Sequence, residues 1–174
     1  MADDDILKGK KILVVDDEPD VLESLEEILD DCDVETAGSY EAAKELLENT
    51  VYDVAILDIM GVRGFDLLEI ATKKKIPAVM LTAHGLNPDN LVGSIKLGAK
   101  SYIPKEKMSE IDIYLKEIFI ARKKGIEKSA NWFERLGSFF ENRFGPGWKN
   151  KDKKFWDEFD QNFTVSKDEL QDIM

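Results

Sequence analysis

Five polar side chains follow short apolar segments that read as β-strands. They are the acidic Asp16, Asp17 and Asp58, the hydroxyl-bearing Thr82 and the basic Lys105. The carboxyl ends of parallel strands lie along one edge of a sheet, so we expect these side chains to gather there. Carboxylates, a hydroxyl and an ammonium group in one place can bind a divalent cation and a phosphoryl group.

Apolar strand-like segments alternate with amphipathic helical segments over the first 120 residues. The predicted strands cover 11–15, 34–37, 52–57, 78–81 and 102–103. Helical spacing of apolar residues predicts helices that begin at Pro19, after an N-cap at Ser39, near Phe65, at Asn87 and after an N-cap at Ser109. This order predicts an α/β fold, a doubly wound five-stranded parallel sheet of flavodoxin-like order 2-1-3-4-5, followed by a C-terminal helical extension.

Size and charge limit the classes of function. The chain has 174 residues, 43% of them hydrophobic, which suffices for one core and an appendage. Its formal net charge of -12 is unfavourable for general nucleic-acid binding, so DNA is not an expected partner. Residues 1–120 hold 13 basic and 26 acidic residues, whereas 121–174 hold 11 and 10. We therefore expect two parts, a domain at 1–120 and an extension at 121–174.

The sequence also favours a reducing compartment. Cys32 is the single cysteine, so no internal disulfide can form, and we expect a small buried side chain there. The first residues show no signal-peptide pattern, and no apolar run approaches the ~20 residues of a membrane span. We expect a cytoplasmic protein, with a membrane as an unlikely partner.

The strand-end residues resemble the receiver domain of bacterial two-component response regulators, a CheY-like family. The resemblance covers roughly residues 9–120. It rests on Val14–Pro19 with its acidic pair, Leu57-Asp58, Leu81-Thr82-Ala83, and Gly98-Ala99 followed by Tyr102 and Lys105. The resemblance does not extend to residues 121–174, whose role it leaves unassigned.

The resemblance implies a phosphoryl acceptor and a metal site. Asp58 would be the phospho-acceptor, taking a phosphoryl group from a histidine kinase or a small acyl phosphate. Asp16, Asp17 and Asp58, with the carbonyl of Met60, would hold Mg²⁺. Independently of the family, clustered carboxylates repel one another, and Mg²⁺ relieves that repulsion through hard oxygen ligands.

The resemblance also implies residues that contact the phosphoryl group and relay its presence. Thr82 and Lys105 would bind phosphoryl oxygens, and Tyr102 would be the aromatic residue that turns inward on activation. His84, the single histidine, would influence how long the phosphoryl group survives. Each also has a plainer interpretation, as an ordinary strand, loop, core or surface residue.

Two features depart from the family pattern. The loop at 59–64 is shorter than usual and lacks a proline, and Lys105 precedes Glu106 rather than a proline. A cis bond without proline costs about 3 kcal/mol, so the peptide after Lys105 should be trans. These departures motivate a second hypothesis, a receiver-like scaffold that no longer uses phosphate. A third, an aspartate-nucleophile phosphatase, normally needs an acid where Met60 stands. We expect no enzyme beyond self-catalysed phosphorylation and dephosphorylation of Asp58.

The extension at 121–174 is rich in aromatic residues that must be buried somewhere. They are Trp132, Phe133, Phe139, Phe140, Phe144, Trp148, Phe155, Trp156, Phe159 and Phe163. The extension could pack on the domain or on itself, form a homodimer, or capture a downstream protein or a membrane surface. Ser166 and Glu169 predict a capping box for a short terminal helix.

Overall fold

The computed structural model of the protein describes residues 5–165. Within them, five strands form one parallel sheet in the order β2-β1-β3-β4-β5. The strands are β1 (Lys11–Val15), β2 (Asp33–Ala37), β3 (Val54–Leu57), β4 (Ala78–Thr82) and β5 (Ser101–Pro104). The predicted fold class and strand order are confirmed.

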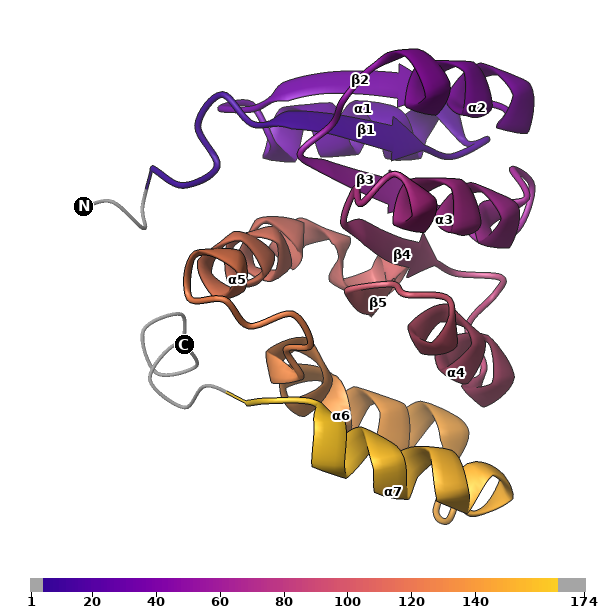
Figure 1. The fold of residues 1–174 in the computed structure, drawn as a ribbon. Helices are drawn as coiled ribbons and strands as arrows, with labels where there is room; N and C mark the ends of the chain where they lie inside the picture. Colours follow the sequence, from indigo (N-terminus) through magenta and orange to yellow (C-terminus); the bar gives the residue numbers. More distant parts are fainter. Residues whose placement is uncertain (1–4, 166–174) are drawn as a thin grey trace.

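Helices cover both faces of the sheet. Figure 1 shows α2, α3 and α4 on one face and α1 and α5 on the other. Their bounds are α1 (Pro19–Ile28), α2 (Tyr40–Asn49), α3 (Gly64–Lys73), α4 (Pro88–Lys96) and α5 (Ile111–Lys123). With both faces covered, a central strand needs apolar side chains on both sides. Every residue of β3 and β4 is accordingly buried. This burial holds the two strands in place and so positions Asp58 after β3 and Thr82 at the end of β4.

The two predicted N-caps behave differently. The Ser39 hydroxyl accepts a hydrogen bond from the Ala42 N–H at 3.2 Å, so the cap of α2 is confirmed. The cap predicted at Ser109 is wrong. Ser109 lies inside a 3₁₀ helix, η1 (Lys105–Glu110), and α5 starts only at Ile111 without a side-chain cap. An N-cap needs extended backbone, and the 3₁₀ turn that leads directly into α5 denies it to Ser109.

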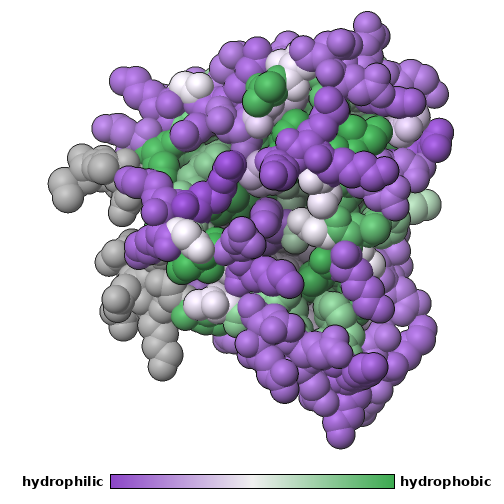
Figure 2. Space-filling view, in the orientation of Figure 1, coloured by the Kyte–Doolittle hydropathy of each residue, from purple (hydrophilic) through white to green (hydrophobic). Residues whose placement is uncertain are grey.

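The extension folds into a helical hairpin. It contains α6 (Asn131–Phe144), a 3₁₀ turn η2 (Asn150–Asp152) and α7 (Lys153–Asn162), and it lies along β5 at the sheet edge. Its rings pack face to face and edge to face, for example Phe133 with Trp156 at 5.0 Å between centroids. Figure 2 shows hydrophilic side chains over much of the visible outer surface, as expected if the rings face inward.

The described helices of the extension are short. The longest, α6, has 14 residues, and none in residues 5–165 is both long and apolar enough for a span. The capping box predicted at Ser166 and Glu169 lies outside the described residues.

The single cysteine is partly buried beside the start of the sheet. Its thiol donates a weak hydrogen bond to the Leu7 carbonyl at 3.2 Å. Burial, followed by the charges of Asp31 and Asp30, raises the pKa of Cys32 to about 11. The thiol is therefore protonated at neutral pH and poorly nucleophilic, because the thiolate is the reactive form.

Candidate functional site

Strand register brings two of the predicted carboxylates together. Val15 of β1 pairs with Leu57 of β3, so Asp16 and Asp58 leave the sheet side by side. The Asp58 N–H donates to the Val15 carbonyl at 3.0 Å and ties the two strand ends. Both aspartates are buried, with 2% and 5% of their surface exposed. Two buried carboxylates at neighbouring strand ends need a cationic partner.

Lys105 provides that partner. It follows β5, whose Pro104 pairs with Thr82 of β4. Its Nζ lies 2.8 Å from Asp16 Oδ2, 3.1 Å from Glu18 Oε1 and 3.4 Å from Asp58 Oδ2. No peptide bond within residues 5–165 is cis, so the Lys105–Glu106 peptide is trans as predicted. The trans peptide does not keep the ammonium group from the acidic cluster.

Burial and neighbouring charges shift the pKa values of Asp58 and Lys105. Burial, then the charge of Asp16, raises the pKa of Asp58 to about 6, while Lys105 and the Ile59 N–H oppose the rise. Burial alone would lower the pKa of Lys105, but hydrogen bonds and charges from Asp16, Asp58 and Glu18 raise it overall. Lys105 is therefore a permanent cation, and Asp58 is an aspartate whose charged form is only moderately favoured at pH 7.

The acidic cluster suits a hard divalent cation. One carboxylate oxygen each from Asp16, Asp17 and Glu18 lies within 4.8 Å of the others. Mg²⁺ prefers oxygen ligands such as carboxylates. It usually keeps several bound waters, which the solvent-exposed side of this cluster can accommodate. Glu18 was missing from the predicted ligand set, although its position directly after the acidic pair was visible in the sequence. Met60 is 52% exposed, and its carbonyl stays a predicted ligand only.

The short loop after Asp58 is closed by glycines. The Ile59 N–H donates to Asp58 Oδ1 at 2.9 Å, and the Gly64 N–H donates to the Ile59 carbonyl at 3.0 Å. Gly61 has a φ of +86°, and a Cβ there would overlap the Asp17 carboxylate. A Cβ at Gly64 would overlap the Asp58 carbonyl. The shortened loop therefore still packs tightly around the acceptor and the acidic pair, and only glycine fits at Gly61 without rearrangement.

Thr82, Tyr102 and His84 lie on or against one loop. Thr82 is fully buried, and its Oγ1 accepts a hydrogen bond from the Gly85 N–H at 2.9 Å. The Tyr102 hydroxyl donates to the Gly85 carbonyl at 2.7 Å and accepts from the Asn87 N–H at 3.1 Å. His84 is exposed on the same loop. The Tyr102 ring is wholly buried. Thr82 and Tyr102 therefore both bind Gly85, the first through its N–H and the second through its carbonyl.

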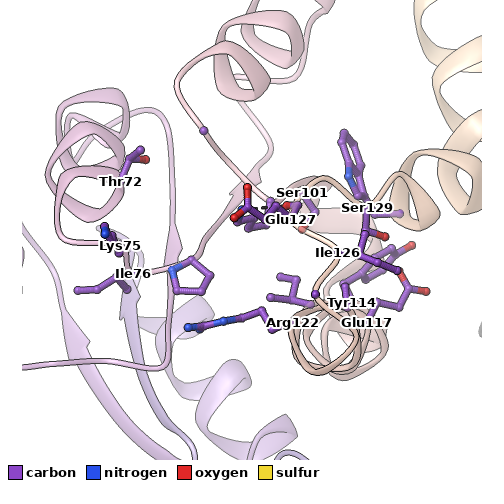
Figure 3. Close-up of a pocket in the computed structure, with 17 residues that line it drawn as sticks. Thr72, Lys75, Ile76, Ser101, Tyr114, Glu117, Arg122, Ile126, Glu127 and Ser129 are labelled. Carbon is purple, nitrogen blue, oxygen red and sulfur yellow. Dashed lines mark hydrogen bonds between the residues drawn. The ribbon is translucent and has the colours of Figure 1, made fainter. Parts of the chain in front are cut away.

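A pocket of about 550 Å³ lies at the other end of the strands from the acidic cluster. Figure 3 shows it between the end of α3, the start of β5 and the segment after α5. Pro77, just before β4, and Ser101, the first residue of β5, line it, which places it at the amino ends of these strands. None of the predicted site residues lines this pocket. The acidic edge, where Asp17 and Glu18 are exposed, lies apart from this pocket.

Comparison with known proteins agrees with this fold. Residues 12–116 match the response regulator receiver domain. The chain belongs to this family. A CheY-like receiver domain protein from Methanospirillum hungatei has a TM-score of 0.63 at 29% identity, covering 68% of this chain and 99% of that one. A receiver domain from Clostridium thermocellum has a TM-score of 0.56 at 33% identity, with coverages of 66% and 97%.

Two curated relatives are longer than the stretch that this chain matches. The transcriptional regulatory protein CpxR of Klebsiella pneumoniae is 34% identical over 130 residues, which are 72% of this chain and 52% of CpxR. The response regulator ARR18 of Arabidopsis thaliana is 37% identical over 103 residues, 56% of this chain and 16% of ARR18. The chain thus spans about half the length of CpxR and a smaller share of ARR18. Because CpxR is named a transcriptional regulator, these relatives do not support the expected exclusion of DNA as a partner.

Proposed function

We propose that this receiver accepts a phosphoryl group on Asp58 from a histidine kinase and signals through protein–protein contacts. The observation that carries the proposal is the buried Asp58 carboxylate with the Lys105 ammonium 3.4 Å away and Asp16 beside it. A buried aspartate at a strand end has little structural reason to be charged. As a nucleophile, it needs a nearby fixed cation to receive a phosphoryl group.

The reaction would be an in-line phosphoryl transfer. An Asp58 carboxylate oxygen forms a bond to phosphorus while the bond from phosphorus to the donor imidazole nitrogen, or to an acyl oxygen, breaks. The leaving group keeps the electron pair. A donor imidazole that carries a proton on its other ring nitrogen leaves as neutral imidazole, and an acyl phosphate leaves as a carboxylate. Lys105 is already held at the site by Asp16 and Glu18, so it can stabilise the transferring oxygens with little reorganisation.

The metal and the hydroxyl complete the proposed site. Asp16, Asp17 and Asp58, with Glu18 as an additional candidate, would hold Mg²⁺. When bound, the ion supplies positive charge that offsets both the clustered carboxylates and the phosphoryl oxygens. Thr82 would donate its hydroxyl to a phosphoryl oxygen. Within residues 5–165 its oxygen accepts a bond from the Gly85 N–H, and a hydroxyl that accepts one bond can still donate its proton.

Phosphorylation by a small donor tests the proposal. Incubation with acetyl phosphate and Mg²⁺ should add the mass of one phosphoryl group to the intact protein. Asp58→Asn should take up none, whereas Asp20→Asn, which changes an exposed aspartate in the first turn of α1, should behave as the wild type. Absence of uptake by the wild type, or equal uptake by Asp58→Asn, would contradict the proposal.

One observation favours the competing function, a scaffold that no longer uses phosphate. Lys105 already contacts three carboxylates, so the cluster is partly neutralised without any ion. A scaffold of this kind should show the same unfolding free energy with Mg²⁺ and with a chelator. A phosphate-using receiver should be stabilised by Mg²⁺, because a ligand that binds only the folded state stabilises it.

A further inference from the structure

The helical hairpin of α6 and α7 covers one face of the receiver. Figure 1 shows it lying along β5, below α5 and α4. Polar contacts join it to three receiver elements: Arg135 in α6 to Glu117 in α5, Arg143 in α6 to Glu106 in η1, and Lys151 in η2 to Asp89 in α4. The Arg135–Glu117 pair is buried, with 12% and 4% of the side chains exposed. The hairpin is therefore docked on this face at several points rather than tethered at one.

The central apolar contact of this docking is made with Tyr102. The rings of Tyr102 and Phe140 lie 6.2 Å apart, and both residues are completely buried. Phe140 in turn packs on Phe133, Phe144 and Trp148, at 5.8, 5.5 and 6.2 Å between ring centroids. Tyr102 thus joins the aromatic cluster of the hairpin to the receiver. A rotation of the Tyr102 ring would disturb its packing against Phe140.

A short chain of contacts connects Tyr102 with the acidic site. The Tyr102 hydroxyl binds the Gly85 carbonyl, and the Gly85 N–H binds Thr82 Oγ1. The loop is also packed against the residue after the acceptor, since a Cβ at Gly85 would lie 2.9 Å from Thr82 Oγ1 and 3.0 Å from Ile59 Cβ. The loop that holds the Tyr102 hydroxyl therefore also holds Thr82 through its oxygen, in an arrangement that leaves the Thr82 proton for a phosphoryl oxygen on Asp58.

We propose that the hairpin of residues 131–163 is a partner in cis for the face formed by α4, β5 and α5, and that it holds Tyr102 inward so that docking and phosphoryl occupancy strengthen each other. The inference rests on the proposed function of Asp58. Its sign follows from the hydrogen bonds: while Phe140 packs against the buried Tyr102 ring, the loop from Thr82 to Asn87 keeps an arrangement in which Thr82 can donate to a phosphoryl oxygen. Binding free energies are reciprocal, so a phosphoryl group that favours this arrangement must tighten the docking equally.

The tryptophans allow a direct readout, because Trp132, Trp148 and Trp156 all belong to the hairpin. Beryllofluoride with Mg²⁺ serves as the phosphoryl mimic. Its binding to the wild type should change tryptophan emission. Its affinity, measured by calorimetry, should fall about fivefold or more in Phe140→Ala. Phe163→Ala is the matched control, since Phe163 stacks on Phe159 at 4.1 Å at the far end of α7 and should leave the affinity unchanged.

A double-mutant comparison tests whether Phe140 acts through Tyr102. In a Tyr102→Ala background, Phe140→Ala should weaken beryllofluoride binding no further, because the shared contact is already lost. Phe140→Leu, which retains an apolar side chain, should recover part of the affinity if Phe140→Ala proves poorly folded by circular dichroism. Equal affinity in the wild type, Phe140→Ala and Phe140→Leu would overturn the inference. So would an equal loss in Phe163→Ala, or a further loss in the double variant. Failure of the wild type to bind beryllofluoride would instead defeat the proposed function, and this inference with it.

Discussion

Replacing Asp58 by asparagine should stabilise the metal-free protein at neutral and alkaline pH. The wild-type carboxylate is buried beside Asp16, and burial together with that charge raises its pKa to about 6. Asparagine resembles the protonated carboxyl group in size and carries no charge at any pH. The substitution leaves Lys105 with its 2.8 Å contact to Asp16 and its 3.1 Å contact to Glu18, so no cation is stranded.

The sign and size of the effect follow from linkage. The folded protein binds the Asp58 proton more tightly than the unfolded chain does, so this group favours folding at low pH and opposes it at high pH. The wild type should lose stability as the pH rises from about 4 to about 6, and the loss is complete above that range. A pKa near 6 lies about two pH units above the ordinary value, which corresponds to at most about 3 kcal/mol. Asp58→Asn should therefore be more stable by up to about 3 kcal/mol at pH 8 and equal to the wild type near pH 4.

Urea unfolding in the presence of a chelator, repeated between pH 4 and pH 8, measures this difference. The chelator is needed because a bound cation would favour the charged carboxylate. Asp157→Asn, which changes an exposed aspartate on α7, is the control and should show no pH-dependent difference of this kind. A difference that does not change with pH, or a variant less stable than the wild type at pH 8, would refute the reasoning about Asp58.

Further substitutions address the metal, the loop, the cation and the hairpin. Mg²⁺ at a hundred times its Kd should raise the unfolding free energy by about 2.7 kcal/mol in thermal or urea unfolding, and Asp17→Asn should remove most of that gain. Gly61→Ala should destabilise the protein by at least about 1 kcal/mol in urea and weaken Mg²⁺ binding, because its φ is positive and its Cβ meets Asp17. Lys105→Met should slow phosphoryl uptake from acetyl phosphate at least about tenfold, as followed by intact mass over time. Arg135→Leu removes charged hydrogen bonds to Glu117 and should lower stability by about 1–3 kcal/mol, with tryptophan emission changing at a lower urea concentration than in the wild type.

The strand ends could be predicted because a parallel sheet leaves few choices. Short segments apolar on both faces, separated by helical segments, require a doubly wound sheet, and such a sheet gathers Asp16, Asp58, Thr82 and Lys105 at one edge. The sequence placed Thr82 directly after its strand, and the structure makes it the last residue of β4. Ser109 failed as a cap because the choice between a 3₁₀ turn and an N-cap depends on how η1 packs, which local sequence does not specify.

The docking of the extension could be predicted only in part. The many aromatic residues predicted that the extension buries apolar surface. The hydrophobic effect has no preferred direction, so the sequence does not indicate whether that surface packs on itself, on the receiver or on a second copy. The contact between Tyr102 and Phe140 joins residues far apart in the chain, and no spacing rule links them. Glu18 was missed for a different reason. Acidic residues are common at the start of a helix, and only the structure shows the Lys105 ammonium beside this one.

The phosphorylated residue itself is the most direct test of the account. After reaction with acetyl phosphate and Mg²⁺, borohydride reduction converts an aspartyl phosphate to homoserine, and peptide mass spectrometry then locates it. The account predicts a single modified position, Asp58, whose labelling disappears without Mg²⁺. Labelling of another residue, or none under conditions in which Mg²⁺ stabilises the fold, would contradict it.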